Sequence, residues 1–146
     1  MHRKEFLKTC GYGCLGLLGA ASLLESCAGT KYLHVPLEGE FLNLPLDAFV
    51  FIKKEKKEFR KYVVVYNDWL QYPVCVYRFS DTEYQALLMK CTHQGTELQV
   101  FGDRIQCPAH GSEFTNTGAV QNGPADAPLR TFPVQVEETV LKINLK

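Results

Sequence analysis

The sequence predicts an all-β protein, built as a small antiparallel barrel or sandwich. Short runs rich in β-branched and aromatic residues recur between turn signals, and several alternate apolar with polar side chains, as Val134, Gln135 and Val136 do. Beyond the N-terminus no run keeps the 3.6-residue apolar period of an amphipathic helix. The expected strands are 40–44, 61–66, 74–79, 84–89, 104–106, 131–137 and 140–145.

Composition narrows the function classes. A chain of 146 residues with 46% hydrophobic residues has the size and apolar content of one ordinary domain. The 16 basic and 16 acidic residues cancel, so the sequence carries no electrostatic footprint for nucleic acid. Six cysteines are compatible with disulfides, a metal site or lipid attachment, and their positions have to decide among these.

The N-terminus has the pattern of an export signal. Residues 1–8 carry three basic side chains and one acidic one, and an uncharged stretch follows at 9–24. As a helix this stretch would be about 24 Å long at about 1.5 Å per residue, which is short for a stable membrane span. We therefore expect 1–26 to be a signal, with an N-terminal transmembrane anchor as the alternative.

Two short motifs bear on the cellular location of the protein. Residues 23–27 (LLESC) resemble the lipobox of bacterial lipoproteins, which would make Cys27 the lipidated first residue of the mature protein. Residues 3–8 (RKEFLK) resemble a twin-arginine export signal with lysine in place of the second arginine. We expect a short tether at 27–39 and a domain at 40–146, held by its N-terminus on the outer, periplasmic face of a bacterial cell envelope.

One dense charge run lies at 53–58 (KKEKKE), before the strand expected at 61–66. Its simplest interpretation is the solvated tip of a hairpin. The alternative is a basic patch that faces anionic lipid head groups or an acidic partner.

Four candidate metal ligands lie in two short mixed pairs. Cys91 and His93 form the first pair, and Cys107 and His110 form the second after 13 intervening residues. Thiolate and imidazole are preferred ligands of zinc and of iron. Structural zinc sites usually pair Cys with Cys and His with His, so the mixed pairs favour iron, with zinc left as the alternative.

Residues 91–95 (CTHQG) and 107–112 (CPAHGS) resemble the two cluster loops of Rieske iron-sulfur proteins, and 123–129 (GPADAPL) resembles the loop that covers the cluster. The resemblance implies one 2Fe-2S cluster per chain. By the same resemblance Cys91 and Cys107 hold the inner iron, His93 and His110 hold the outer iron, and the Ser112 hydroxyl donates to a bridging sulfide.

The sequence also departs from the high-potential members of that family. Thr96 and Ala109 stand where those proteins have two further cysteines, so no disulfide joins the loops, and Phe114 replaces a tyrosine donor. Because donors to cluster sulfur raise the potential, we expect a value below the quinol-oxidising members and above an all-cysteine ferredoxin.

The resemblance implies an electron-transfer protein, a carrier or redox subunit and not an enzyme on its own. Its partner would be a redox protein such as a quinol-oxidising cytochrome complex or a periplasmic oxidoreductase. Two alternatives remain open at this point. One is a ferredoxin-like donor to an oxygenase, and the other is a zinc-stabilised interaction module without a redox role.

Overall fold

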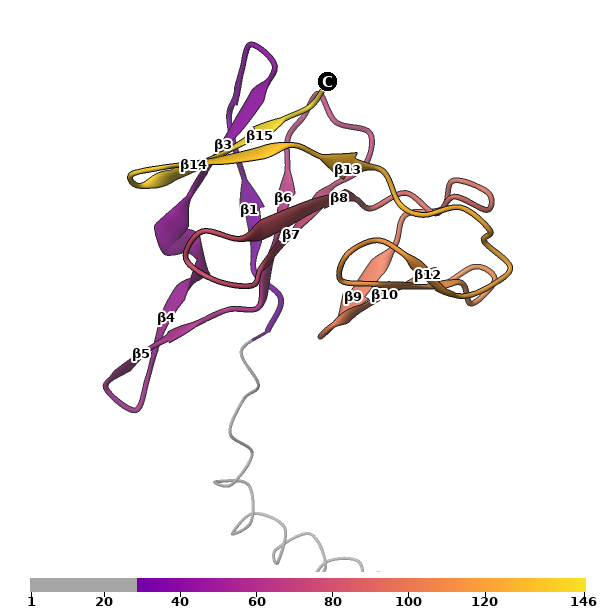
Figure 1. Ribbon diagram of the computed structural model, residues 1–146, viewed down its shortest axis with the longest axis horizontal. Coiled ribbons are helices and arrows are strands. Elements are labelled where there is room, and N and C mark those ends of the chain that lie inside the picture. The colour runs from indigo at the N-terminus through magenta and orange to yellow at the C-terminus, as the bar shows by residue number, and fades with distance from the viewer. Residues whose placement is uncertain (1–28) are drawn as a thin grey trace, which may run out of the picture.

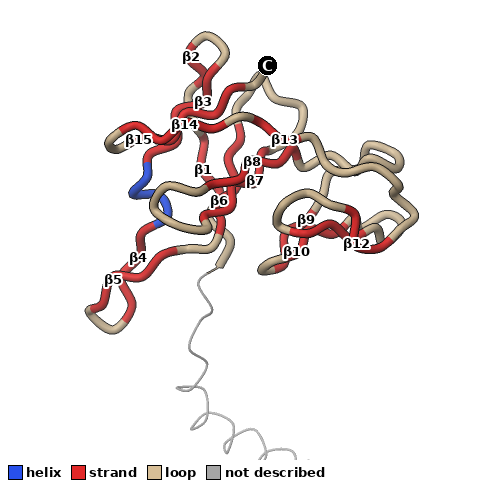
Figure 2. The backbone as a smooth tube through the Cα atoms, in the orientation of Figure 1, coloured by secondary structure: helices blue, strands red, loops and turns tan. Residues whose placement is uncertain are grey.

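The computed structural model describes residues 29–146 (Figure 1). These residues form β-strands and one short 3-10 helix, Leu46–Phe49, with no α-helix among them (Figure 2). The predicted all-β class is therefore confirmed. The predicted export signal at 1–26 and the predicted lipid site Cys27 lie outside the described residues. Within residues 29–146, no helix has both the length and the hydropathy needed to cross a membrane.

A five-stranded sheet forms the centre of the domain. Its strands, in spatial order, are β1 (Tyr32–His34), β6 (Tyr62–Tyr66), β7 (Val74–Arg78), β8 (Tyr84–Leu88) and β13 (Thr131–Phe132). β1 runs parallel to β6, and the other neighbours are antiparallel. A four-stranded sheet packs against it, in the order β14 (Val134–Glu137), β15 (Val140–Asn144), β3 (Phe41–Pro45) and β2 (Leu37–Glu38).

The central sheet is covered on both faces, which explains its nearly continuous apolar runs. Val63 and Val65 of β6 pack into the core shared with the second sheet, together with Leu42 and Ile143. Val64, which lies between them in β6, points the other way into a second core. Since successive side chains of a strand alternate between its faces, three consecutive buried valines require a layer on each side.

The second core belongs to a smaller subdomain, which lies to the right in Figure 1. Its antiparallel sheet has the order β12 (Val120–Asn122), β11 (Glu113–Thr115), β10 (Arg104–Gln106) and β9 (Gln99–Phe101). Ile105 and Phe114 of this sheet are fully buried in the same core as Leu87 of β8. The subdomain thereby packs on the face of the central sheet that points away from the second sheet.

The charge run forms the hairpin expected at its position. β4 (Val50–Lys53) pairs with β5 (Lys56–Phe59), and Lys54 and Glu55 form the turn between them. Both turn residues have positive φ, 48° and 64°, as a type I′ turn requires. The hairpin projects to the lower left in Figure 1.

The expected domain start at residue 40 is corrected by the structure, because part of the predicted tether 27–39 is folded. β1 extends the central sheet, and the chain on either side of it is bonded to β6. Val64 N–H donates to the Lys31 carbonyl at 2.9 Å, and Val35 N–H donates to the Tyr66 carbonyl at 3.0 Å. Strands as short as β1 and β2 lack the length over which alternation becomes visible in a sequence.

Candidate metal centre

Two loops with the same backbone design carry the four predicted ligands. Gly95 N–H donates to the Cys91 carbonyl at 2.8 Å, and Gly111 N–H donates to the Cys107 carbonyl at 3.0 Å. Both glycines have positive φ, 74° and 78°, a conformation that glycine adopts without strain. In each loop the cysteine N–H also donates to the carbonyl five residues later, at 2.8 Å. Each loop is thus a closed turn whose two ends are held together by backbone hydrogen bonds.

The four predicted ligands meet as two pairs. Cys91 and Cys107 are 1% and 3% exposed, and their side chains are within hydrogen-bonding contact. His93 and His110 are exposed, with ring centroids 5.0 Å apart in an edge-to-face arrangement. No three His, Cys, Asp or Glu side chains in residues 29–146 gather around a single ion position. By their exposure, the two thiols lie in the interior and the two imidazoles lie at the surface.

The backbone of the second loop favours a thiolate at Cys107. Burial raises the pKa of this thiol, but hydrogen bonds from the Ala109 backbone and the Cys91 side chain outweigh burial and lower it overall. The His110 backbone and the Thr96 side chain add to the lowering. Because the thiolate is the form that binds metal, these donors prepare the sulfur for a ligand role.

A third loop, 123–129, closes over the other two and is bonded to both. Ala125 N–H donates to Ser112 Oγ at 2.9 Å, and Thr92 Oγ1 donates to the Ala127 carbonyl at 2.7 Å. Ser112 is completely buried, and since its oxygen accepts this bond, its O–H is left to donate elsewhere. Thr92 lies between two predicted ligands, but its contact with the third loop is not apparent from the sequence.

Tyr72 anchors the first loop, and its partner there could not be identified from the sequence. It lies between β6 and β7, and its hydroxyl donates to the Gly95 carbonyl at 2.7 Å. This bond ties the first loop to the central sheet across 23 residues of sequence, a separation that no local motif can indicate.

Comparison with known protein families identifies the family to which this domain belongs. The Rieske [2Fe-2S] domain matches residues 49–133, which is more than half of the chain and contains all three loops. The chain belongs to the Rieske [2Fe-2S] domain family.

Relatives of this Rieske protein include proteins of two kinds. Cytochrome b6-f complex iron-sulfur subunit 2 of Nostoc sp. is 35% identical over 61 residues, 40% of this chain and 34% of that protein. Ferredoxin CarAc of Metapseudomonas resinovorans is 39% identical over 70 residues, 45% of this chain and 64% of that protein. The match thus spans about a third of the cytochrome subunit and just under two thirds of the ferredoxin.

A solved structure shows the same fold. The crystal structure of the cyanobacterial plasma membrane Rieske protein PetC3 from Synechocystis PCC 6803 superposes with a TM-score of 0.50 at 28% identity. The superposition covers 57% of this chain and 86% of that one.

As a Rieske protein the chain carries one 2Fe-2S cluster, and its residues fit that group. Two buried sulfurs and two surface imidazoles match the donor set of an unsymmetrical two-iron centre. The cluster supplies one-electron transfer when it is bound. The chain's own residues shelter the sulfur side under 123–129 and leave the imidazole edges at the surface, where a partner can approach.

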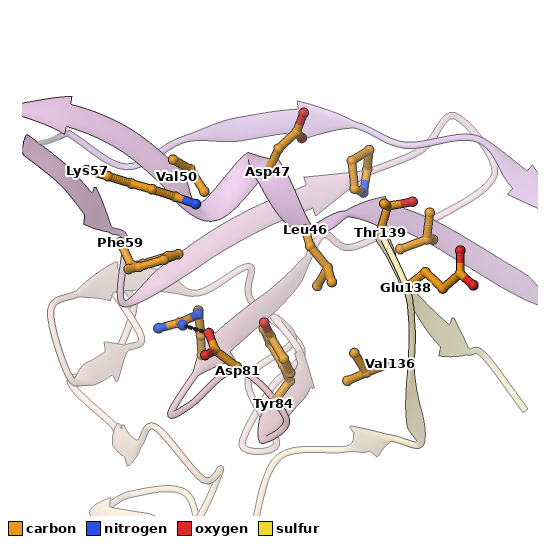
Figure 3. A pocket seen from close by; sticks show the side chains of 13 residues that line it. Leu46, Asp47, Val50, Lys57, Phe59, Asp81, Tyr84, Val136, Glu138 and Thr139 are labelled. Atoms are coloured by element: carbon orange, nitrogen blue, oxygen red, sulfur yellow. Dashed lines mark hydrogen bonds and ion pairs between the residues drawn. The ribbon is translucent and has the colours of Figure 1, made fainter.

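In residues 29–146 one further cysteine and a surface groove lie outside this arrangement. Cys75 of β7 is fully buried, and burial raises the pKa of its thiol, so this residue packs as a small apolar side chain of the core. A groove of about 720 Å³ lies between the hairpin, which contributes Lys57 and Phe59, and the segment with Asp81 and Tyr84 (Figure 3). None of the predicted ligands lines this groove.

Proposed function

We propose that this Rieske protein is a membrane-tethered electron carrier on the outer face of a bacterial cell envelope. In this proposal Cys91 and Cys107 hold the inner iron, and His93 and His110 hold the outer iron. The observation that carries the ligand assignment is the separation of buried thiols from exposed imidazoles within two equivalent loops. Single electrons would enter and leave at the imidazole edge, in a respiratory or periplasmic redox system.

The described chain supports a very short tether. Arg60 Nη1 donates to the Gly29 carbonyl at 3.2 Å, and Thr30 Oγ1 is bonded to the Tyr62 hydroxyl at 2.8 Å. Residue 29 is therefore already in contact with the domain, and only Ala28 lies between it and Cys27. At roughly 3.5 Å per residue, a lipid on Cys27 would hold the domain directly against the bilayer.

A cysteine substitution tests the tether. We expect the full chain, expressed in a bacterium, to fractionate with membranes and to incorporate labelled fatty acid. Cys27→Ala should lose the label, whereas Cys14→Ala, a matched change within the predicted signal, should keep it. Membrane association without label in the unaltered chain would show an uncleaved anchor instead, and a label that persists in Cys27→Ala would refute the lipid site.

The second candidate function is a ferredoxin that serves an oxygenase. It is favoured by the similarity to ferredoxin CarAc, which is higher in identity than the similarity to the cytochrome subunits. The two functions differ in location and partner. Purification from membranes together with a quinone-binding cytochrome favours the first, and recovery from the cytosol with electron transfer to an oxygenase favours the second.

A further inference from the structure

We propose that one face of the β4–β5 hairpin docks on anionic lipid head groups and so sets the orientation of the domain on its membrane. The inference rests on the membrane tether proposed above. We call this surface the hairpin face, defined by Phe51, Lys53, Lys56, Glu58 and Arg60.

The strand register places these side chains together. Phe51 pairs with Glu58, and Lys53 pairs with Lys56, so all four point to the same side of the two-stranded ribbon. The Arg60 guanidinium lies 5.0 Å from the centre of the Phe51 ring, which places it on this side as well. The hairpin face thus carries three cations and an aromatic ring against one carboxylate, and the turn residues Lys54 and Glu55 balance each other in charge.

The point where the described chain begins lies on this same face. Arg60, which stacks on Phe51, also donates to the Gly29 carbonyl. A hollow of about 530 Å³ beside them is lined by Gly29, Phe51, Arg60, Lys61 and Tyr62, among others. In Figure 1 the hairpin and the start of the described chain both face the lower side. A tether attached at Cys27 would therefore bring the hairpin face close to the bilayer.

The chemistry of the face suits a lipid surface. Basic residues near an anionic bilayer each contribute about fivefold to binding, and aromatic side chains favour the interface. Because the tether already confines the domain, these contributions act on orientation alone and need not offset the loss of translational freedom. The cluster loops lie on the far side of the central sheet from the hairpin in Figure 1, so docking leaves the imidazole edge open to a partner.

Tryptophan quenching tests the docking. The full chain with its cluster is reconstituted into vesicles of brominated phosphatidylcholine, with or without phosphatidylglycerol. The reporter is Phe51→Trp combined with Trp69→Phe. The unaltered chain is the positional control, because its single tryptophan, Trp69, is 84% exposed and follows β6 at the opposite end from Tyr62.

We expect the tryptophan introduced at position 51 to be quenched in phosphatidylglycerol vesicles and Trp69 to be spared. High salt and Lys53→Glu with Lys56→Glu should both reduce the quenching at position 51, the docked fraction falling at least about fivefold per lysine. The matched pair Lys142→Glu with Lys146→Glu, on and after β15, should leave it unchanged. Equal quenching at positions 51 and 69, or equal effects of the two charge-reversed pairs, would overturn the inference.

Vesicle flotation distinguishes a failure of the docking face from a failure of the membrane tether. If the chain floats with vesicles at high salt but position 51 is not quenched at low salt, the tether stands and the docking face is refuted. If position 51 is quenched at low salt but flotation is lost at high salt, docking stands and the tether is refuted.

Discussion

Replacing Ser112 with alanine is expected to lower the midpoint potential of the cluster. Ser112 is completely buried, and its oxygen accepts the Ala125 N–H at 2.9 Å, so its own proton is directed away from that bond. In the proposed site this proton would be donated to a sulfur of the cluster. Such a donor stabilises the more negative, reduced state, and its loss makes reduction harder.

The size of the effect follows from hydrogen-bond energies. A bond to a charged acceptor is stronger than one to a neutral acceptor by about 0.5–1.5 kcal/mol. Because about 1.4 kcal/mol corresponds to about 59 mV for one electron, Ser112→Ala should lower the potential by about 20–60 mV. The variant also leaves the buried Ala125 N–H without its acceptor, which should cost about 1–3 kcal/mol of stability.

The assay is a redox titration followed by electron paramagnetic resonance, with iron content measured in parallel. Thr115→Val is the matched control, because Thr115 Oγ1 also accepts backbone N–H groups, from Thr117 and Ala119, but lies beyond the loops. The control should retain the unaltered potential. A Ser112→Ala protein with full iron content and an unchanged or higher potential would refute the assigned hydrogen bond.

Three further predictions concern a buried glycine contact, a strained turn residue and the buried cysteine. Gly118→Ala should destabilise the protein by about 2–4 kcal/mol, since its new methyl would lie 2.8 Å from a Leu87 methyl group at a φ of 87°. Gly102→Ala is the control, because Gly102 also has positive φ but has open space around it, and it should cost only about 1 kcal/mol. Equal losses of unfolding free energy for the two variants in chemical denaturation would contradict the contact between Gly118 and Leu87. Glu55→Gly should stabilise the hairpin by about 0.5–1 kcal/mol, because it relieves a non-glycine residue at φ 64°, and a lower unfolding midpoint would argue against that strain. Cys75→Ala should keep its full iron and sulfide content, and loss of the cluster without loss of folded protein would assign this thiol a role at the metal.

The sequence was sufficient for the central sheets and the loops because both depend on local patterns. The run Val63 to Val65 and the alternation at Val134 and Val136 predict strands directly, and those strands are present. The two ligand pairs occur in short motifs, so their chemistry is visible before any contact is known. Cys75 stands alone within an apolar run, without a companion ligand, and this pattern indicates the core position that it occupies.

The features that the sequence did not reveal depend on contacts between distant segments. β1 is three residues long and is held by its pairing with β6, so residues 32–34 were predicted to be tether. Tyr72 reaches Gly95 through a turn that a single sequence does not indicate. Short strands such as β9, β11 and β12 are stabilised by their neighbours in a small sheet rather than by their own propensity.

The most direct test of the central claim is a pulsed electron paramagnetic resonance spectrum of the reduced, full-length protein. The account predicts a 2Fe-2S signal coupled to the nitrogens of two imidazoles, with one coupling lost in His93→Cys and the other in His110→Cys. A reduced cluster signal without nitrogen coupling would contradict the assignment of His93 and His110 to the outer iron.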